Sequence, residues 1–189
     1  VFTFLTLKAI NDDGFDVNKM PTPPAISTVI AMLMHKLVKN EKVEIVDPTI
    51  GTGILLFSII SQLKALNHSK DNYQLVGIDN DEEMLNLADV AAHLNDFDIE
   101  LYCQDALMPW MCSNPDVVVS DLPIGYYPVD ENAKKFENRA EKGHSFAHLL
   151  LIEQIIKNLK PAGYAFLVVP KSILSGKIGA DFMPWLTKK

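Results

Sequence analysis

The chain has 189 residues, 48% of them hydrophobic, and its 24 acidic and 17 basic side chains give a formal net charge of −7. A chain of this length can bury the core of one domain, and its apolar runs are too short to span a membrane. The acidic balance disfavours a protein that binds duplex DNA unaided, because neutralisation of phosphates by basic side chains dominates such binding. We expect a cytoplasmic protein that binds DNA poorly on its own.

The domain organisation follows from composition and from the ends of the chain. Residues 1–18 are predicted to be an N-terminal arm or linker, and residues 19–189 a single domain that is incomplete at its C-terminus. Val1 is not an initiator methionine, which favours a fragment of a longer protein. Cys103 and Cys112 are too few for a disulfide framework and lack the spacing of metal ligands, so we expect reduced thiols and no metal site.

Apolar runs alternate with helical patterns along the chain. Alternation of this kind predicts an α/β fold with a doubly wound, mainly parallel sheet. Val117, Val118 and Val119 form a continuous β-branched run, typical of a strand buried on both faces. The charges of segment 130–144 cancel, which favours a solvated, mobile flap. The expected strands are 43–46, 73–78, 99–102, 117–119 and 164–169, and the expected helices are 24–39, 53–65, 81–93 and 145–159.

A glycine turn follows the first expected strand. Gly51 and Gly53 stand between that strand and the apolar helical pattern, where glycine allows the backbone to approach a ligand closely. A dinucleotide site would carry a third glycine, but Leu56 occupies that position. Asp47 ends the strand; it would repel a diphosphate and can accept hydrogen bonds from an ammonium group. The turn therefore favours a nucleotide-like ligand that carries an amine.

Three acids stand at the carboxyl ends of three successive expected strands, namely Asp47, Asp79 and Asp105. In an open parallel sheet these ends line the ligand crevice, and an acid placed as Asp79 accepts hydrogen bonds from ribose hydroxyls. Each acid taken singly could instead cap a helix or form a turn.

Several motifs resemble those of a known family. Asp-Pro-x-x-Gly-x-Gly at 47–53 resembles the first motif of the S-adenosylmethionine-dependent methyltransferases that act on amino groups, particularly adenine-specific DNA methylases and type I modification subunits. Segment 116–128, which contains Ser-Asp-Leu-Pro-Ile-Gly-Tyr-Tyr-Pro, resembles the family's Asn/Asp-Pro-Pro-aromatic motif and, more closely, a subgroup of adenine-specific methylases from Gram-positive bacteria. The resemblance runs from about residue 19 to residue 170.

The resemblance implies a class I, Rossmann-like methyltransferase that methylates an exocyclic amine, most simply N6 of adenine in DNA. S-adenosylmethionine would be the cofactor, DNA the substrate of the full-length protein, and a specificity subunit or further domains its partners. The implied catalytic residues are Asp121, Leu122, Pro123 and Tyr126. The implied cofactor-binding residues are Thr22, Pro23, Asp47, Pro48, Thr49, Gly51, Gly53, Asp79, Asn80, Asp105 and Ala106.

The resemblance gives several of these residues a role. Asp121 and the carbonyl of Leu122 would hold the amine, Asp105 would accept from the adenine amino group of the cofactor, and Thr22-Pro23 would cover its methionine end. Thr22-Pro23 could equally be a rigid entry to the following helix.

The chain also departs from the family motif. Leu122 replaces the first proline, and Ile124 stands where an aromatic ring would stack on a flipped base. Tyr126 or Tyr127 could supply the ring instead. Two alternatives therefore stay open: a non-catalytic cofactor-binding or interaction module that has lost its base pocket, and an enzyme of the same fold that methylates RNA or a protein glutamine amide.

Overall fold

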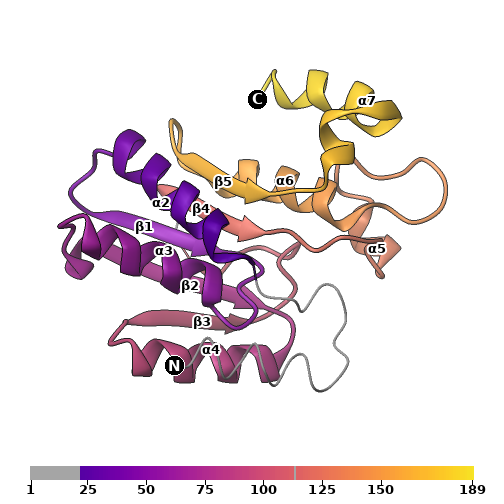
Figure 1. Ribbon diagram of the computed structural model, residues 1–189. Coiled ribbons are helices and arrows are strands. Elements are labelled where there is room, and N and C mark those ends of the chain that lie inside the picture. Colours follow the sequence, from indigo (N-terminus) through magenta and orange to yellow (C-terminus); the bar gives the residue numbers. More distant parts are fainter. Residues whose placement is uncertain (1–21, 113) are drawn as a thin grey trace.

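The computed structural model describes residues 22–112 and 114–189, so the expected arm at 1–18 lies outside the described residues. Five parallel strands form one sheet in the order β3-β2-β1-β4-β5 (Figure 1). The predicted parallel α/β architecture is confirmed. The strands are β1 (Val43–Asp47), β2 (Tyr73–Asp79), β3 (Ile99–Cys103), β4 (Val117–Asp121) and β5 (Tyr164–Val168), and the main helices are α2 (Pro24–Leu37), α3 (Ile54–Ala65), α4 (Glu82–Leu94) and α6 (Ala147–Asn158).

Helices cover both faces of the sheet because the inner strands are apolar on both faces. In β4, Val117 and Val119 pack into the core that holds residues of α2, α3 and α4, whereas Val118 packs into a second core with α6. All three valines are fully buried, as their β-branched run predicts. The sheet is therefore doubly wound, and its carboxyl edge carries the loops that follow each strand.

Local sequence signals account for the helix starts. Pro24 occupies the first turn of α2, where its missing N–H costs nothing. Asp81 caps α4, because its side chain accepts hydrogen bonds from the backbone N–H groups of Glu83 and Met84. Helical spacing from buried residues would also predict burial of Leu37 in α2 and Leu87 in α4, but both are exposed.

In the described part of the chain, four short elements were not expected from the sequence. They are the 3-10 turns η2 (Lys70–Asn72) and η3 (Lys171–Leu174), and the helices α5 (Asp130–Ala133) and α7 (Gly176–Leu186). Glycines and Pro184 weaken the helical signal of α7. Ile178, Phe182 and Trp185 nevertheless recur at helical spacing, and they pack on the α6 side of the sheet.

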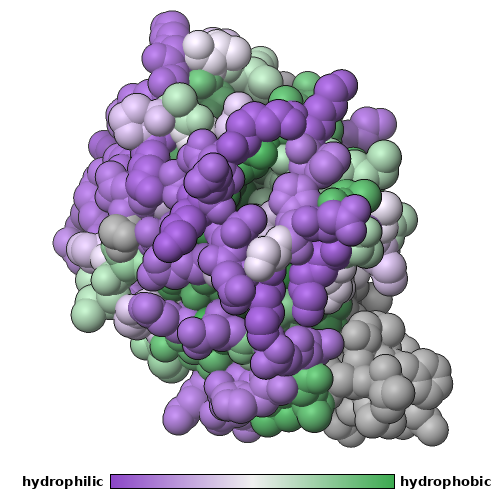
Figure 2. Space-filling model, turned by 90° about the vertical axis from the view of Figure 1, so that its left-hand side faces the viewer, coloured by the Kyte–Doolittle hydropathy of each residue, from purple (hydrophilic) through white to green (hydrophobic). Residues whose placement is uncertain are grey.

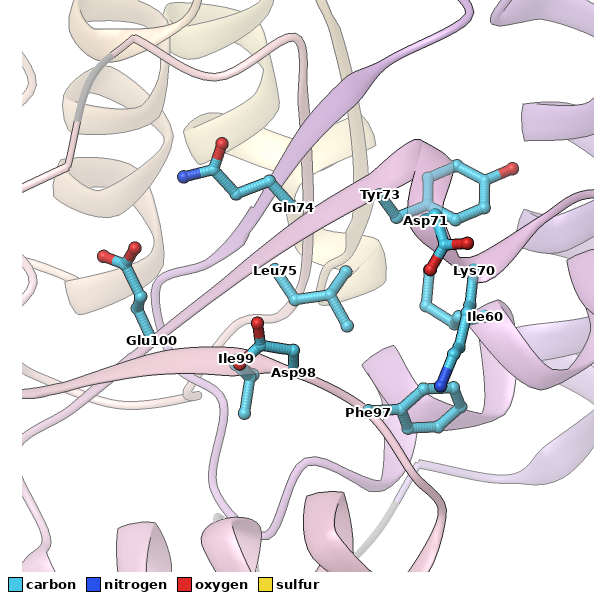
Figure 3. A pocket seen from close by; sticks show the side chains of 10 residues that line it. All are labelled: Ile60, Lys70, Asp71, Tyr73, Gln74, Leu75, Phe97, Asp98, Ile99 and Glu100. Atoms are coloured by element: carbon cyan, nitrogen blue, oxygen red, sulfur yellow. The ribbon is translucent and has the colours of Figure 1, made fainter.

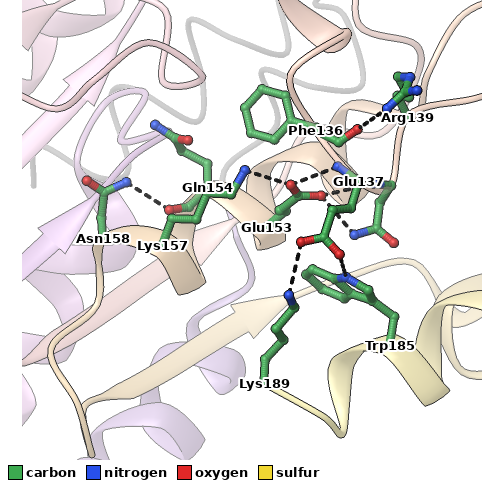
Figure 4. A network of polar contacts seen from close by, with 10 residues as sticks. Phe136, Glu137, Arg139, Glu153, Gln154, Lys157, Asn158, Trp185 and Lys189 are labelled. Carbon is green, nitrogen blue, oxygen red and sulfur yellow. Dashed lines mark hydrogen bonds and ion pairs between the residues drawn. The ribbon is translucent and has the colours of Figure 1, made fainter.

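The segment expected to be a mobile flap is anchored in the structure. The Phe136 ring is 1% exposed. The buried Glu153 carboxylate of α6 accepts hydrogen bonds from the backbone N–H groups of Glu137 and Asn138, both at 2.9 Å (Figure 4). Glu137 in turn accepts from Trp185 Nε1 of α7 at 2.8 Å. The segment is therefore held to two helices rather than free in solvent.

The opposite edge of the molecule, at the amino ends of the strands, presents a largely hydrophilic surface (Figure 2). A hollow of about 440 Å³ lies there, between the start of β2 and the start of β3, and its ten lining residues include none of the predicted site residues (Figure 3). Within the described part of the chain, no helix is long and apolar enough to cross a membrane. The residues predicted to bind cofactor and substrate lie at the carboxyl edge of the sheet instead.

Candidate active site

The glycine turn between β1 and α3 presents bare backbone to the carboxyl edge. Gly51 has a φ of +54°, and a Cβ added there would meet nothing within 4 Å. Gly53 has a φ of +76°, and a Cβ there would lie 2.2 Å from the Phe57 ring. The two glycines thus have different roles. Gly53 permits the tight entry into α3, and Gly51 leaves open space beside the chain.

Asp79 ties this turn to the end of β2. Its Oδ2 accepts from the Gly51 N–H at 2.8 Å, and its Oδ1 accepts from the Asp81 N–H at 3.0 Å. Burial raises the pKa of the carboxyl, although these hydrogen bonds oppose the shift. The Asn80 N–H also donates to this carboxylate; of about four acceptor sites three are thus taken, and Asp79 retains one for a ligand hydroxyl. The next residue, Asn80, is exposed.

Asp47 is the most deeply buried acid of the site, with 1% of its surface exposed. Burial raises its pKa to about 7, against hydrogen bonds from the Thr49 N–H and the Ser120 side chain, and the nearby charges of Asp79 and Asp121 raise it further. Pro48 is buried beside it. A positively charged ligand group would favour the ionised carboxylate here.

Two hydroxyl groups link the glycine turn to the end of β4. The Thr49 and Ser120 hydroxyl oxygens lie 2.5 Å apart, and Thr49 Oγ1 donates to the Asp121 backbone carbonyl at 3.2 Å. Each hydroxyl has a single proton, and that of Ser120 is directed to the Asp47 carboxylate, so the Thr49 proton goes to either the Ser120 oxygen or the Asp121 carbonyl at any one time. The sequence analysis assigns no role to Ser120, although a serine that directly follows the buried valine run and precedes Asp121 is a signal for one.

The Asp121 side chain stands at the carboxyl end of β4, half-buried. Thr22 Oγ1 donates to its Oδ2 at 2.7 Å. Burial raises the pKa of this carboxyl, and the hydrogen bond from Thr22 opposes the shift. Among residues 22–112 and 114–189, Thr22 is the one donor to this carboxylate, while the neighbouring Pro23 is exposed. The Thr22 side chain thus contacts the predicted amine acceptor.

The residues after Asp121 differ in exposure: Leu122 and Tyr127 are buried, and Ile124 and Tyr126 between them are exposed. Leu122 is 3% exposed and its N–H donates to the Val168 carbonyl of β5 at 3.1 Å, so its side chain fills the core. Pro123 is partly exposed. Ile124 and Tyr126 are 56% and 62% exposed. The Tyr126 ring stacks on Phe146, with ring centroids 4.8 Å apart and planes 20° apart.

The two adjacent tyrosines therefore have different environments. Tyr126 faces solvent, whereas Tyr127 is 7% exposed and its hydroxyl donates to Asp105 Oδ2. The other oxygen, Asp105 Oδ1, accepts from the Leu107 N–H at 2.9 Å, and Ala106 between them is buried. Sequence reasoning left open which tyrosine could stack on a substrate; in the structure Tyr126 is the accessible one.

The predicted residues meet along one edge of the sheet. Asp47, Asp79 and Asp121 interact through the glycine turn and the hydroxyl pair, and Asp105 joins them through Tyr127. Open space beside Gly51 and carboxylates that can accept from hydroxyls and amines fit a nucleoside that carries an ammonium group. This set of hydrogen-bond acceptors suits S-adenosylmethionine better than a diphosphate, which the acids would repel.

Comparisons with known proteins agree with this geometry. The YtxK protein of Bacillus subtilis, itself uncharacterised, is 40% identical over 186 residues, which cover 96% of this chain and 55% of that protein. A solved structure from Listeria monocytogenes, described as a candidate class I S-adenosylmethionine-dependent methyltransferase, superposes with a TM-score of 0.91 at 39% identity, over 98% of this chain and 57% of that one. The chain thus spans little more than half the length of these relatives.

A more distant structure shares the fold. The modification subunit of a candidate type I restriction enzyme from Vibrio vulnificus superposes with a TM-score of 0.73 at 18% identity, over 97% of this chain and 41% of that one. The fold is that of the Rossmann-like, S-adenosylmethionine-dependent methyltransferases, which makes S-adenosylmethionine the cofactor. The family model described as N-6 DNA Methylase matches residues 5–181. The chain therefore belongs to the N-6 DNA methylase family.

Proposed function

We propose that the full-length protein transfers a methyl group from S-adenosylmethionine to an exocyclic amino nitrogen, N6 of adenine in DNA. The observation that supports this most directly is the position of Asp121 at the end of β4: Thr22 donates to one oxygen of its carboxylate, and its backbone carbonyl accepts from the Thr49 hydroxyl of the glycine turn. An amine acceptor and a cofactor-binding turn are thereby fixed relative to each other.

In this reaction the protein mainly positions the reactants and does not need to supply a reactive group of its own. The cofactor supplies a methyl group on a sulfonium, which is already a good leaving group. Asp121 Oδ1 and the Leu122 carbonyl accept the two N–H bonds of the amine and aim its lone pair, and alignment of this kind lowers the barrier. Burial raises the pKa of Asp121, which suits its carboxylate to take the proton that the amine loses.

In this proposal, Tyr126 is the aromatic residue that stacks on the substrate base. Its ring is exposed and is backed by Phe146, and an antiparallel bridge pairs the two residues. A ring supported on one face offers the other to a base, and stacking contributes roughly 1 to 3 kcal/mol per base. Tyr126 would thus take the place of the aromatic residue that Ile124 replaces.

The rest of the full-length protein would supply most of the DNA contacts. The chain is acidic, and Arg139, its single arginine, donates to the Phe136 carbonyl at 3.0 Å. A partner that reads the DNA sequence, such as the specificity subunit of a type I system, is part of this proposal.

The test is methyl transfer by full-length protein that carries Asp121→Ala, with Asp89→Asn on the exposed face of α4 as the matched control. Labelled S-adenosylmethionine is offered with DNA, RNA or protein. We expect Asp121→Ala to abolish transfer to DNA and to leave cofactor affinity within about twofold, while the control stays active. Full activity of Asp121→Ala would overturn the proposal, and transfer to RNA or protein alone would move it to that substrate.

Ile124 favours a second candidate function, a cofactor-binding interaction module without transfer activity. Its exposed side chain stands where the family motif has an aromatic ring. Cofactor binding by full-length protein, with no transfer to any of the three substrates, would support this candidate.

A further inference from the structure

The Tyr127 hydroxyl is fixed between two partners of opposite hydrogen-bonding character. Asn132 Nδ2 of α5 donates to it at 3.2 Å, and the hydroxyl donates to Asp105 Oδ2. A carboxylate accepts only and an amide nitrogen donates only, so the direction of both hydrogen bonds is determined. Burial raises the pKa of Tyr127 to about 12, and the hydrogen bond to Asp105 adds to the shift. The hydroxyl therefore stays a donor throughout the physiological pH range.

The Tyr127 backbone belongs to the loop that carries the proposed amine acceptor. Its N–H donates to the Ser145 carbonyl at 2.8 Å, and the Gly125 carbonyl accepts from the Ala147 N–H at 3.0 Å. These bonds attach the loop to the start of α6. The side chain of Tyr127 thus joins a rigid part of this loop to the acid at the end of β3.

Asp105 has its orientation fixed from both sides. Oδ1 accepts from the Leu107 N–H at 2.9 Å and Oδ2 from Tyr127. A carboxylate offers about four lone-pair sites, so one remains on each oxygen for a ligand. Without the Tyr127 hydroxyl, the carboxylate would keep only the hydrogen bond from the Leu107 N–H of these two, and it could rotate away from the cofactor.

We propose that Tyr127 is a positioning residue: its hydroxyl orients Asp105 to receive the exocyclic amine of the cofactor's adenine, and so joins the amine-acceptor loop to cofactor recognition. The inference rests on the proposed function, together with the role that the family resemblance implies for Asp105 as the acceptor of that amine. It makes Tyr127 a determinant of the preference for adenine over a purine with oxygen at the same position.

The test compares S-adenosylhomocysteine with S-inosylhomocysteine, in which oxygen replaces the adenine amino group, by calorimetric titration of the full-length protein. Wild type should prefer the first ligand by about tenfold or more, as expected for loss of a hydrogen bond to a charged group. Tyr127→Phe keeps the buried ring and should lose most of this preference. Tyr164→Phe, on the edge strand β5, is the control and should keep it.

A double-mutant cycle shows whether Tyr127 acts through Asp105. In an Asp105→Ala background, Tyr127→Phe should change the preference no further. Asn132→Ala, which removes the donor to Tyr127, should reduce the preference less than Tyr127→Phe does, and it serves as a milder variant if Tyr127→Phe melts early. Such an effect on ligand choice is not expected from a merely structural role.

The outcomes separate this inference from the proposed function. If wild type binds neither ligand, cofactor binding itself fails, and the inference falls with it. If wild type prefers S-adenosylhomocysteine and Tyr127→Phe keeps that preference, the inference alone is overturned. Binding of both ligands by wild type with equal affinity would also overturn it, because Asp105 would then not read the amine.

Discussion

Thr22 and Asp121 are 99 positions apart in the chain, yet Thr22 Oγ1 donates a 2.7 Å hydrogen bond to Asp121 Oδ2. The bond joins the segment before α2 to the carboxyl end of β4. It occupies one oxygen of the proposed amine acceptor and fixes the plane of the carboxylate. The Thr22-Pro23 element therefore lies beside the proposed acceptor of the substrate amine.

Thr22→Val should slow methyl transfer by about tenfold, because it removes a hydrogen bond to a charged group while nearly preserving side-chain volume. Thr22→Ser keeps the hydroxyl and should retain most activity. The Thr22 bond lowers the pKa of Asp121, so its loss should raise that pKa and shift the acid limb of the rate profile to higher pH. Rate profiles of both variants, with cofactor affinity measured in parallel, provide the check. An effect of Thr22→Val on affinity alone would instead favour the role predicted from the resemblance, a cover for the methionine end.

Cofactor binding should strengthen as the pH rises through about 7. Burial raises the pKa of Asp47 to about 7 in the free protein, and a bound ammonium group would lower it. The complex then holds fewer protons than the free protein, so affinity increases with pH and binding releases protons near neutrality. Calorimetry in two buffers of different ionisation enthalpy measures this release. Asp47→Asn should abolish it, and release that persists in that variant would assign the proton to another group.

Tyr126→Ala should raise the KM for DNA, because it removes the exposed ring proposed to stack on the base. A loss of roughly 1 to 3 kcal/mol corresponds to about 5- to 150-fold. Tyr126→Phe keeps the ring and should behave as wild type. Steady-state kinetics at saturating cofactor test this prediction, and an unchanged KM for Tyr126→Ala would remove Tyr126 from the substrate site.

Glu153→Ala should destabilise the fold by about 3 kcal/mol, since it leaves buried donors without their acceptor. The carboxylate, 1% exposed, accepts four hydrogen bonds: from the Glu137 N–H, from the N–H and Nδ2 of Asn138, and from Lys157 Nζ (Figure 4). Glu131→Ala, which breaks an exposed ion pair with Lys134, is the control and should cost less than about 0.5 kcal/mol. Urea denaturation of both variants measures the difference.

The same residue predicts a dependence of stability on pH. Burial raises the pKa of Glu153, but Lys157 and the three N–H donors outweigh it and hold the pKa below the usual 4.5. A lowered pKa contributes stability above 4.5, which is lost as the pH falls through the folded-state value. Wild type should therefore lose stability on acidification below about pH 4.5 by more than Glu153→Ala does. Equal losses would contradict this assignment.

The sequence predicted the sheet because its signals are local. The buried strands β1, β2 and β4 are short apolar runs. Asp47 and Asp79 end the first two, and Asp105 lies two residues after the end of β3. The exposed Leu87 shows the limit of this reasoning, because helical spacing gives the direction of the buried face but not where that face ends.

The side-chain partnerships of the site could not be predicted from the sequence. Thr22 with Asp121 and Tyr127 with Asp105 join segments that meet only through tertiary packing. The adjacent tyrosines carried a partial signal, because successive residues of an extended chain point to opposite sides. Which of the two is buried depends on the start of α6, to which the loop is bonded.

Calorimetric titration of this chain with S-adenosylmethionine, with NAD as the control ligand, tests the central claim most directly. The acids at the strand ends and the open space beside Gly51 predict binding of S-adenosylmethionine, with a dissociation constant on the order of micromolar, and no binding of NAD, whose diphosphate would meet Asp47. Binding of NAD in place of S-adenosylmethionine, or of neither ligand by a chain that melts cooperatively, would contradict the account.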